Sequence, residues 1–418
     1  MITKHNIIIF FTICIHIILA LIYCNNQILS SDGMEILSKG FTQHYYGLED
    51  HSLNLYTSYV SVPMYIWENL YSPMILIMIS KLLSFYIIYY SLKPFLSRIT
   101  MTWFSVIYLL SPWFLYHINI SYNTYLDLGV ALFLYAVCNL YTNVCSTSKS
   151  LFFILILCIG IYWCSQFHSS WVVLLIITIL LLIKKPLKLN RFCFYVLFLA
   201  LILITSYTVY KSLEENPQIP NDDGFIGYGM FYIYPIFKTL IYWIRFSSTV
   251  FPNNLLLNTE FHWISASESI QQASNIIWLT ILYAFGIFSL LVSLCANFIV
   301  IKHTKSLIFS KQKLENNLDF LKLLALFTII ALIIYSAIYP QLLSSWQLNI
   351  CFIFSLIPLL VLIEKYKDTK LIYHFYWIIS LIAFLGIVNF CGAVESKNYN
   401  LNSSYVNQVE NLIEPLFN

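Results

Sequence analysis

Charged side chains are scarce in this sequence. Only 10% of the 418 residues are Asp, Glu, Lys or Arg, whereas 60% are hydrophobic and the mean hydropathy is +0.77. Such a composition leaves too little polar surface for a soluble globular protein, so that class is excluded. The net charge of +3 says little by itself, and the placement of the charges along the chain is more informative.

Several catalytic and structural motifs are missing as well. There is no Gly-rich phosphate loop, HExxH or GxSxG, so nucleotide-driven chemistry is not expected. No CxxC or Cys/His cluster indicates a metal site, and no nucleic-acid partner is expected. Cysteines within apolar runs behave as small hydrophobes rather than as a disulfide set; they are Cys14, Cys138, Cys158, Cys295 and Cys351.

Long apolar runs are what the sequence has in their place. Each run of about 17 to 22 residues is long enough to cross roughly 30 Å of hydrocarbon, which predicts an all-α, polytopic transmembrane protein with about 11 spans. The first run lacks a small-x-small cleavage pattern and is interpreted as a retained helix. The expected spans are 6–24, 73–92, 101–117, 122–142, 151–165, 169–183, 192–210, 273–301, 319–339, 348–363 and 371–391.

The basic residues predict how these spans are oriented. With a cytoplasmic N-terminus, 15 of the 22 Lys and Arg residues fall in segments on the inner side, as the positive-inside rule requires. Flipping the chain would move nearly all of them outside. They are Lys4, Lys93, Arg98, Lys149, Lys184, Lys185, Lys188, Arg191, Lys302, Lys305, Lys311, Lys313, Lys365, Lys367 and Lys370.

The outer face then receives the long polar segments. A membrane module, 1–391, would carry a first outer loop at 25–72 and a long outer loop at 211–272, followed by a tail at 392–418. Apolar and aromatic residues at helical spacing in Met34–Phe41 and Tyr65–Leu70 predict helices lying along the interface. The segment 231–250 is interpreted in the same way, because a span there would reverse every later orientation.

Acidic residues gather in the first outer loop, between Ser30 and Trp67. Asp32 and Glu35 have the spacing of a capping box if a helix starts at Gly33. Alternatively, Asp32 is a general base that takes a proton from an attacking hydroxyl. The polar residues of this loop include Asp32, Glu35, Glu49, Asp50, His44 and His51.

Other candidates lie in or near spans. Asp127 falls about one turn inside the outer end of its span, where a carboxylate needs a wet cavity or a partner. Lys81 lies nearer a span centre, and three alternatives are open for it. Its ammonium extends to the membrane surface, pairs with a carboxylate such as Asp127, or lines a phosphate site. Gln166 and His168 occupy a tight outer turn, where the alternative is a structural histidine.

The order of these features resembles the GT-C glycosyltransferases, in particular the bacterial relatives of protein O-mannosyltransferases and aminoarabinose–lipid A transferase (glycosyltransferase family 39). Those enzymes have an acidic residue soon after the first span, a position that Asp32 matches. PMYIW at Pro63–Trp67 is similar to a P-x-x-Y-W-like stretch of the family. SPWFLYHINISYNTYLDLGV resembles their third-to-fourth span hairpin, with Asp127 near an acidic position, and QFHSS is similar to a Q-x-H-x-S turn. The family's adjacent acidic pair is here Asp32-Gly33, which leaves the base open among Asp32, Glu35 and Asp127.

The resemblance implies a GT-C-like fold and inverting transfer of a sugar at the outer leaflet of a bacterial inner membrane. The donor would be a polyprenyl-phosphate-linked sugar and the acceptor an envelope glycan or glycolipid, as in lipopolysaccharide biosynthesis. Basic side chains would stabilise the departing phosphate. No metal ligands are expected, although a divalent cation stays open as a cofactor. The implied substrate-binding residues are Lys81, Lys238, Arg245, Gln166, His168, Tyr65 and Trp67.

Two observations bear on the cations and on the rival functions. Lys238 and Arg245 lie seven residues apart among aromatic residues, so they share one helix face, where they hold the donor phosphate or simply pair with anionic lipid headgroups.

An O-antigen polymerase or ligase is the first rival function, and a transporter or flippase is the second. The long outer loop is poor in arginine, which counts against the first. Few span centres are polar, which counts against the second.

Overall fold

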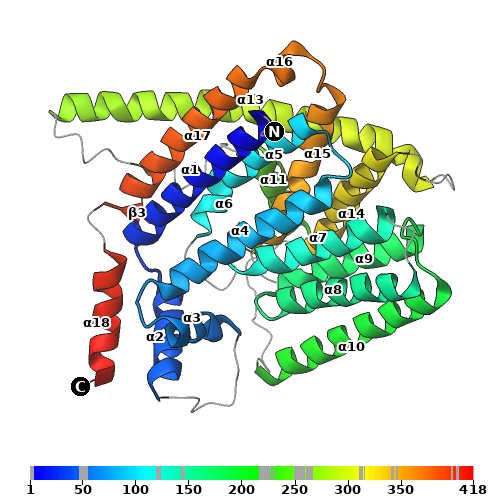
Figure 1. The fold of residues 1–418 in the computed structure, drawn as a ribbon, viewed down its shortest axis with the longest axis horizontal. Coiled ribbons are helices and arrows are strands. Elements are labelled where there is room, and N and C mark those ends of the chain that lie inside the picture. Colours follow the sequence, from blue (N-terminus) through cyan, green and yellow to red (C-terminus); the bar gives the residue numbers. More distant parts are fainter. Residues whose placement is uncertain are drawn as a thin grey trace.

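A computed structural model describes residues 4–46, 55–118, 124–142, 146–215, 227–228, 231–248, 259, 267–309, 314, 316–339, 343–344, 347–396, 399–401 and 404–417. Nearly all of them are helical (Figure 1). Within these residues, eight helical units are long and apolar enough to cross a membrane. They are α1 (Lys4–Asn26), α4 (Ser72–Leu92), α5 (Arg98–Leu109) with α6 (Pro112–Tyr116), α8 (Thr147–Ser165), α10 (Arg191–Glu215), α13 (Glu268–Phe309), α14 (Asn317–Ile338) and α17 (Phe375–Glu395).

The remaining elements are shorter. Three of them coincide with the other expected spans: α7 (Leu126–Thr142), α9 (Val172–Lys184) after the 3₁₀ turn η1 (Ser169–Trp171), and α15 (Phe352–Lys365) after η2 (Asn349–Cys351). The prediction of an all-helical membrane protein is confirmed at this coarse level. The other elements are α2 (Ser31–Tyr46), α3 (Leu55–Ile66), α11 (Ile233–Ser247), α16 (Lys370–Tyr373), α18 (Tyr405–Phe417), β3 (Tyr399–Asn400) and the paired strands β1 (Gly227–Tyr228) and β2 (Phe231–Tyr232).

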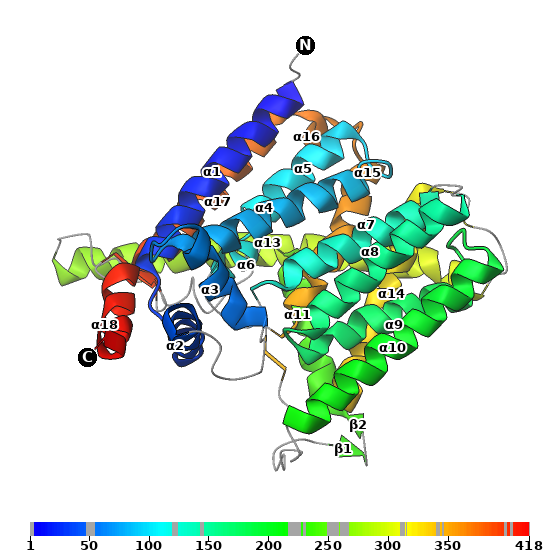
Figure 2. The same ribbon diagram turned by 60° about the horizontal axis from the view of Figure 1, so that its bottom comes forward.

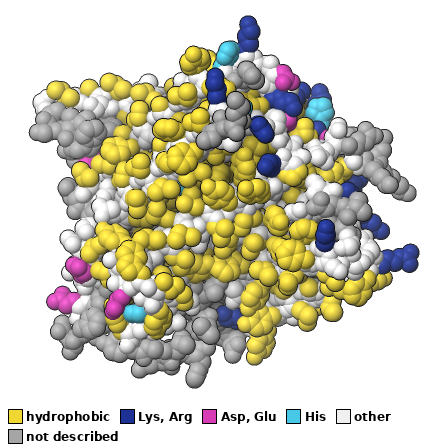
Figure 3. Space-filling view, in the orientation of Figure 1, with side chains coloured by type: hydrophobic (Ala, Val, Ile, Leu, Met, Phe, Trp, Pro, Cys, Tyr) yellow, Lys and Arg dark blue, Asp and Glu magenta, His cyan; other side chains and the backbone are white. Residues whose placement is uncertain are grey.

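Hydrogen bonds between connecting segments define one end of the bundle, which we call the basic end. Ser97 N–H donates to the Glu364 carboxylate at 2.8 Å, and Lys188 N–H donates to Leu140 O at 3.0 Å. The His5 ring lies 3.0 Å from Thr102 Oγ1, which brings the start of α1 to the same end. Figure 3 shows that Lys and Arg side chains gather mainly along the top and right edges of this view, whereas Asp and Glu lie at the left and also among the cations at the top.

The other helix ends meet at the opposite end of the bundle. Tyr71 Oη donates to Asn25 Oδ1 at 3.0 Å, and Trp163 Nε1 donates to Tyr125 O at 3.0 Å. The Ser169 hydroxyl lies 3.1 Å from the Tyr335 hydroxyl. These contacts place the end of α1, the start of α4 and the turn after α8 at this opposite end.

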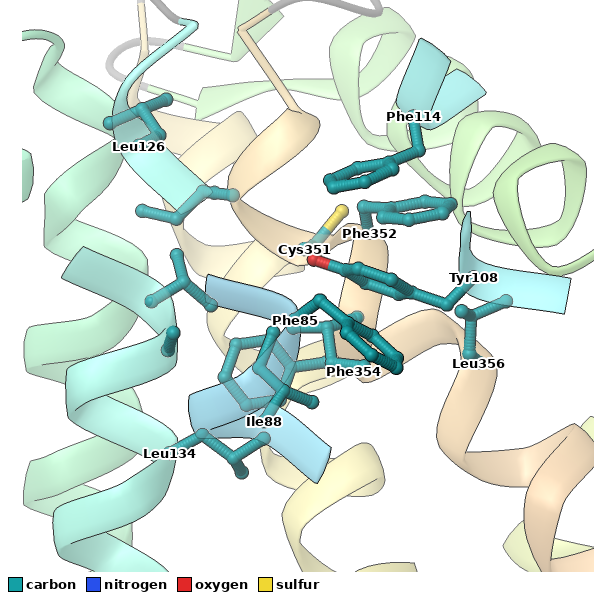
Figure 4. Close-up of a cluster of buried hydrophobic side chains, with 14 of the residues drawn as sticks. Phe85, Ile88, Tyr108, Phe114, Leu126, Leu134, Cys351, Phe352, Phe354 and Leu356 are labelled. Atoms are coloured by element: carbon teal, nitrogen blue, oxygen red, sulfur yellow. The ribbon is translucent and has the colours of Figure 1, made fainter. Parts of the chain in front are cut away.

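Helices α7 and α8 pack closely, and two glycines permit the approach. A Cβ on Gly129 would lie 2.8 Å from Gly160 O, and one on Gly160 would lie 2.7 Å from Gly129 O. Small residues at such crossings let backbones pack closely where lipid supplies no hydrophobic driving force. The core continues across α4, α5, α6 and α15, where the rings of Tyr108, Phe114 and Phe352 lie together (Figure 4).

The polar segment after α1 folds into two helices beside the C-terminal helix (Figure 2). The prediction of a helix over Met34–Phe41 is confirmed by α2. The prediction over Tyr65–Leu70 is wrong, because α3 ends at Ile66 and the chain then bends towards α4. In the tail, Gln408 of α18 accepts from Leu29 N–H and donates to Gln27 O, both at 2.9 Å, so α18 is fastened to the end of α1.

Helix α11 packs against α13, α14 and α15 (Figure 2), and its opposite face, with Tyr234, Phe237 and Ile241, is exposed. Its 15 residues extend about 22 Å, less than the roughly 30 Å of a hydrocarbon core. Trp243 Nε1 donates to Asn297 Oδ1 of α13 at 2.8 Å, and the Ser247 hydroxyl bonds to that of Ser293. These buried polar contacts explain how a short helix with Pro235 and two cations is accommodated among apolar helices.

Candidate functional site

Asp32 and Glu35 lie on the exposed side of α2. The helix begins at Ser31, and the Ser30 hydroxyl accepts a hydrogen bond from Gly33 N–H at 3.2 Å. Ser30 is therefore the N-cap, and the predicted Asp32–Glu35 capping box is wrong because the helix starts earlier than its pattern suggests. Glu35 pairs instead with Lys39 at 2.5 Å, whereas Asp32 is exposed in the first turn, where a carboxylate interacts favourably with the helix dipole.

Tyr65 and Trp67 lie where α3 ends. The Tyr65 hydroxyl lies 3.2 Å from His44 O and 3.3 Å from Gln43 O, so it ties the end of α3 to the end of α2. Both side chains are exposed. The sequence expectations for Glu49, Asp50 and His51, in the connection between these helices, fall outside the described residues.

An aromatic cluster joins the α2–α3 hairpin to the spans. Tyr59 of α3 stacks on Tyr125 at 3.6 Å between ring centroids, and its ring also meets Trp163 and Phe167 edge-on. Tyr125 directly precedes α7, and Phe167 lies in the turn between α8 and η1. The first polar segment is therefore packed over the ends of α7 and α8, close to the turn that holds Gln166 and His168.

Lys81 and Asp127 form a buried ion pair between α4 and α7. Their Nζ and Oδ2 atoms lie 2.5 Å apart, and the side chains are only 1% and 8% exposed. Asn349 Nδ2 donates to the second oxygen, Asp127 Oδ1, at 3.5 Å. Lys81 also lies 4.6 Å from the centroid of the Phe114 ring. The sequence alternative in which Lys81 pairs with Asp127 is confirmed.

Helix α6 places aromatic rings against two cations. Phe114 faces Lys81, and the neighbouring Trp113 ring lies 5.3 Å from the guanidinium carbon of Arg245. Arg245 lies at the same distance from the Tyr242 ring of its own helix. Cation–π contacts of this kind hold a cation where water is largely absent.

Two nitrogens at α6 are buried without a hydrogen-bond partner among the described residues. They are Trp113 Nε1 and His117 Nε2, and their side chains are 3% and 2% exposed. An indole N–H can only donate, whereas an imidazole nitrogen donates or accepts according to its tautomer. Buried polar groups without partners are rare in proteins. We refer to Lys81, Trp113, Phe114, His117 and Arg245 as the α6 cluster.

His168 and Gln166 are positioned by the turn between α8 and α9. His168 Nδ1 accepts from Ser170 N–H at 3.0 Å and so caps η1. Burial lowers the pKa of His168 to about 4, and a neutral imidazole is what this capping bond requires. The capping bond supports the alternative interpretation, in which His168 is a structural residue. Gln166 Nε2 donates to its neighbour Ser165 at 3.3 Å.

The expected site residues fall into separate groups. Lys81, Asp127 and Arg245 surround α6, and Gln166 and His168 lie in the turn behind the Tyr59 cluster. Asp32, Glu35, Tyr65 and Trp67 lie on the α2–α3 hairpin. Lys238, two turns before Arg245 on α11, is half-buried, and burial lowers its pKa.

Sequence reasoning missed Asn349 and Trp113 and did not select His117 as a site residue. Asn349 lies in η2, far along the chain from Asp127, so no local pattern marks it. His117 and Trp113 do carry a weak signal, because polar nitrogens in an apolar turn must be paired or functional. No group of three or more His, Cys, Asp or Glu that could hold a metal ion occurs in the described part of the chain.

Comparison with protein-family models, with curated proteins and with solved structures gave no match for this chain. Fold and composition therefore define its class, a bundle of apolar helices built to lie in a membrane.

Proposed function

We propose that this protein is a membrane glycosyltransferase of the GT-C type. It moves a sugar from a polyprenyl-phosphate donor to an envelope glycan or glycolipid, with inversion at the anomeric carbon. The site lies at the opposite end of the bundle, which we assign to the outer face of a bacterial inner membrane because the other end carries most of the cations. The N-terminus is then cytoplasmic.

The α6 cluster is the observation that carries this proposal. Two cations, and two nitrogens without a hydrogen-bond partner in the described part of the chain, lie around one short helix near an end of the bundle. Fixed donors and cations of this kind favour a reaction in which negative charge grows on a leaving group. A lipid phosphate meets that description, and its isoprenoid chain belongs among apolar helices.

The reaction divides among the named residues. Asp32 takes the proton of the acceptor hydroxyl, whose oxygen forms a bond to the anomeric carbon. The bond between that carbon and the phosphate oxygen breaks, and the electron pair leaves with the polyprenyl phosphate. Arg245, supported by Lys238 and by Lys81 when it exchanges Asp127 for phosphate, stabilises this charge. Tyr65, Trp67, Gln166 and His168 contact the sugar and acceptor.

The assignment of the base is tested by a matched pair on α2. Asp32→Asn keeps the size of the side chain and removes its basicity, so transfer falls about a hundredfold or more. Glu35→Gln, one turn away and also exposed, leaves transfer unchanged. Both are measured as envelope-glycan masses from cells that express equal amounts of protein in the membrane. Full transfer by Asp32→Asn, together with loss in Glu35→Gln or Asp127→Asn, moves the base to the affected residue.

The buried Lys81–Asp127 pair favours a second candidate, a transporter or flippase. Ionisable pairs inside a membrane often mark ion or proton pathways. Transport predicts movement of a lipid-linked sugar between leaflets without any change in its mass. Glycosyl transfer predicts a new glycan mass and free polyprenyl phosphate, so mass spectrometry of both lipid and glycan separates the two.

A further inference from the structure

An apolar groove runs between α9 and α10, far from the α6 cluster. Its volume is about 550 Å³. Helix α10 packs mainly against α8 and lies at the edge of the bundle in both views (Figures 1 and 2). The walls are built from Leu175, Ile179 and Leu182 of α9 and from Phe198, Leu201 and Ile202 of α10.

Cations stand at the basic end of this groove. A second cavity of about 300 Å³ shares Leu182, Lys185 and Phe194 with the groove and is bounded by Arg191. Lys185 and Arg191 are both exposed, and neither pairs with a carboxylate among the described residues. The groove therefore combines an apolar body with a positively charged mouth.

The backbone fixes the position of Lys185. It ends α9 with a φ of 55°, the one positive φ at a non-glycine position in the described part of the chain. A lysine in this left-handed region carries a conformational cost and persists only where its surroundings hold it. Its N–H donates to Leu181 O at 2.9 Å, which anchors the mouth of the groove to α9.

The length of the groove suits one acyl chain. From Phe194 to Ser206 α10 advances about 18 Å, slightly more than half of a hydrocarbon core of roughly 30 Å. The hydroxyl-bearing residues Thr205 and Ser206 lie at the far end. A lipid of the leaflet at the basic end therefore fits with one acyl chain along the groove and its headgroup at the mouth.

We propose that the α9–α10 groove binds one anionic phospholipid of the leaflet at the basic end. An acyl chain lies along the groove, and the phosphate lies between Lys185 and Arg191. Charge complementarity selects an anionic headgroup, because two exposed cations at the membrane surface attract anionic lipid. This site is independent of the proposed sugar transfer and of the donor lipid.

Native mass spectrometry of the purified full-length chain in detergent tests the site. Phosphatidylglycerol and phosphatidylcholine with the same acyl chains are the probes. The wild type binds one phosphatidylglycerol about 30-fold more tightly than phosphatidylcholine, and Lys185→Asn with Arg191→Gln removes that preference. Each single variant loses about fivefold, the value of one surface cation. Asn at position 185 tolerates the left-handed backbone.

Two controls make the result specific. Lys302→Gln with Lys365→Gln removes two other exposed cations outside the groove and leaves binding unchanged. Ile202→Trp fills the groove while keeping both cations, so it weakens binding of long-chain phosphatidylglycerol at least fivefold without lowering the melting temperature. Equal binding of the two lipids by the wild type overturns the proposal. An equal loss in the control pair, or unchanged binding by Ile202→Trp, does so as well.

Discussion

At the residue scale, the Lys81–Asp127 pair is the most consequential contact of the bundle. Removing two charges from water costs several kcal/mol per ion, and their mutual attraction offsets this only when geometry and further hydrogen bonds are good. Phe114 beneath the ammonium and Asn349 at the second carboxylate oxygen supply part of that compensation. The pair therefore has one of two roles. It holds α4 against α7, or it keeps the Lys81 ammonium in place to bind the substrate phosphate.

A double-mutant cycle separates these roles. Lys81→Met or Asp127→Leu alone leaves one uncompensated buried charge and lowers the free energy of unfolding by about 3–5 kcal/mol. The double variant, which removes both charges, regains most of that stability. Thermal unfolding in detergent measures the effect, and Lys322→Met, which breaks a less buried ion pair with Asp319, is the control with little loss.

Activity of the double variant then decides what the pair does. Loss of transfer in a variant of restored stability assigns the pair to the reaction, Lys81 as the proposed phosphate ligand or Asp127 as the base. Full transfer makes the pair structural alone and removes Lys81 from the site. A double variant no more stable than either single one contradicts the account of the pair itself.

At the element scale, the α7–α8 crossing determines the relative positions of two groups of candidate site residues. Asp127 is in the first turn of α7, and the Gln166–His168 turn follows α8. The spacing of these two helices therefore determines the distance between Asp127 and that turn. The spacing depends on Gly129 and Gly160, each of which faces the backbone of the other helix.

Gly129→Val tests this dependence. A Cβ there lies 2.5 Å from Cys164 Sγ and 2.8 Å from Gly160 O, so the helices must separate, at a cost of about 1–3 kcal/mol or more. Gly386→Val in α17 is the control, because no heavy atom lies within 4 Å of its added Cβ. Melting temperatures in detergent measure both. An unchanged value for Gly129→Val contradicts the close crossing.

Prediction from sequence succeeded for the long apolar helices. It failed where tertiary contacts determine the position of an element or its end. Each expected span contains a helix, because apolar runs of this length have few other structures in a membrane. The start of α2 was misplaced because Ser30, not Asp32, caps it. The packing of one face of α11 against α13 was not predicted, since it depends on polar partners that lie about fifty residues away in the chain.

At the scale of the whole molecule, the gathering of Lys and Arg side chains at one end underlies the proposed topology (Figure 3). The pairing of Lys81 with Asp127 was open to prediction because each needs a partner inside an apolar span. The assembly of the α6 cluster was not, because α4, α6 and α11 are brought together only by the fold.

Cysteine labelling of intact spheroplasts tests the topology. Trp67→Cys, after α3, reacts with a membrane-impermeant maleimide, because the proposed topology places the α2–α3 hairpin outside. Lys185→Cys reacts only after permeabilisation, because the proposed topology places the basic end in the cytoplasm. The unmodified chain reports the background from its own cysteines. External labelling at Lys185→Cys contradicts both the orientation and the placement of the site.

The most direct test of glycosyl transfer uses membranes from cells that lack this protein, which contain unused donor and acceptor. Purified wild-type protein, added without any nucleotide sugar, raises the mass of an envelope glycan or glycolipid by one glycosyl residue and releases an equal amount of polyprenyl phosphate. Arg245→Gln abolishes both changes, and Arg245→Lys weakens them, because a lysine lacks the bidentate geometry of the guanidinium. No change in glycan mass with the wild type, or transfer by both Arg245 variants at the wild-type level, contradicts the account.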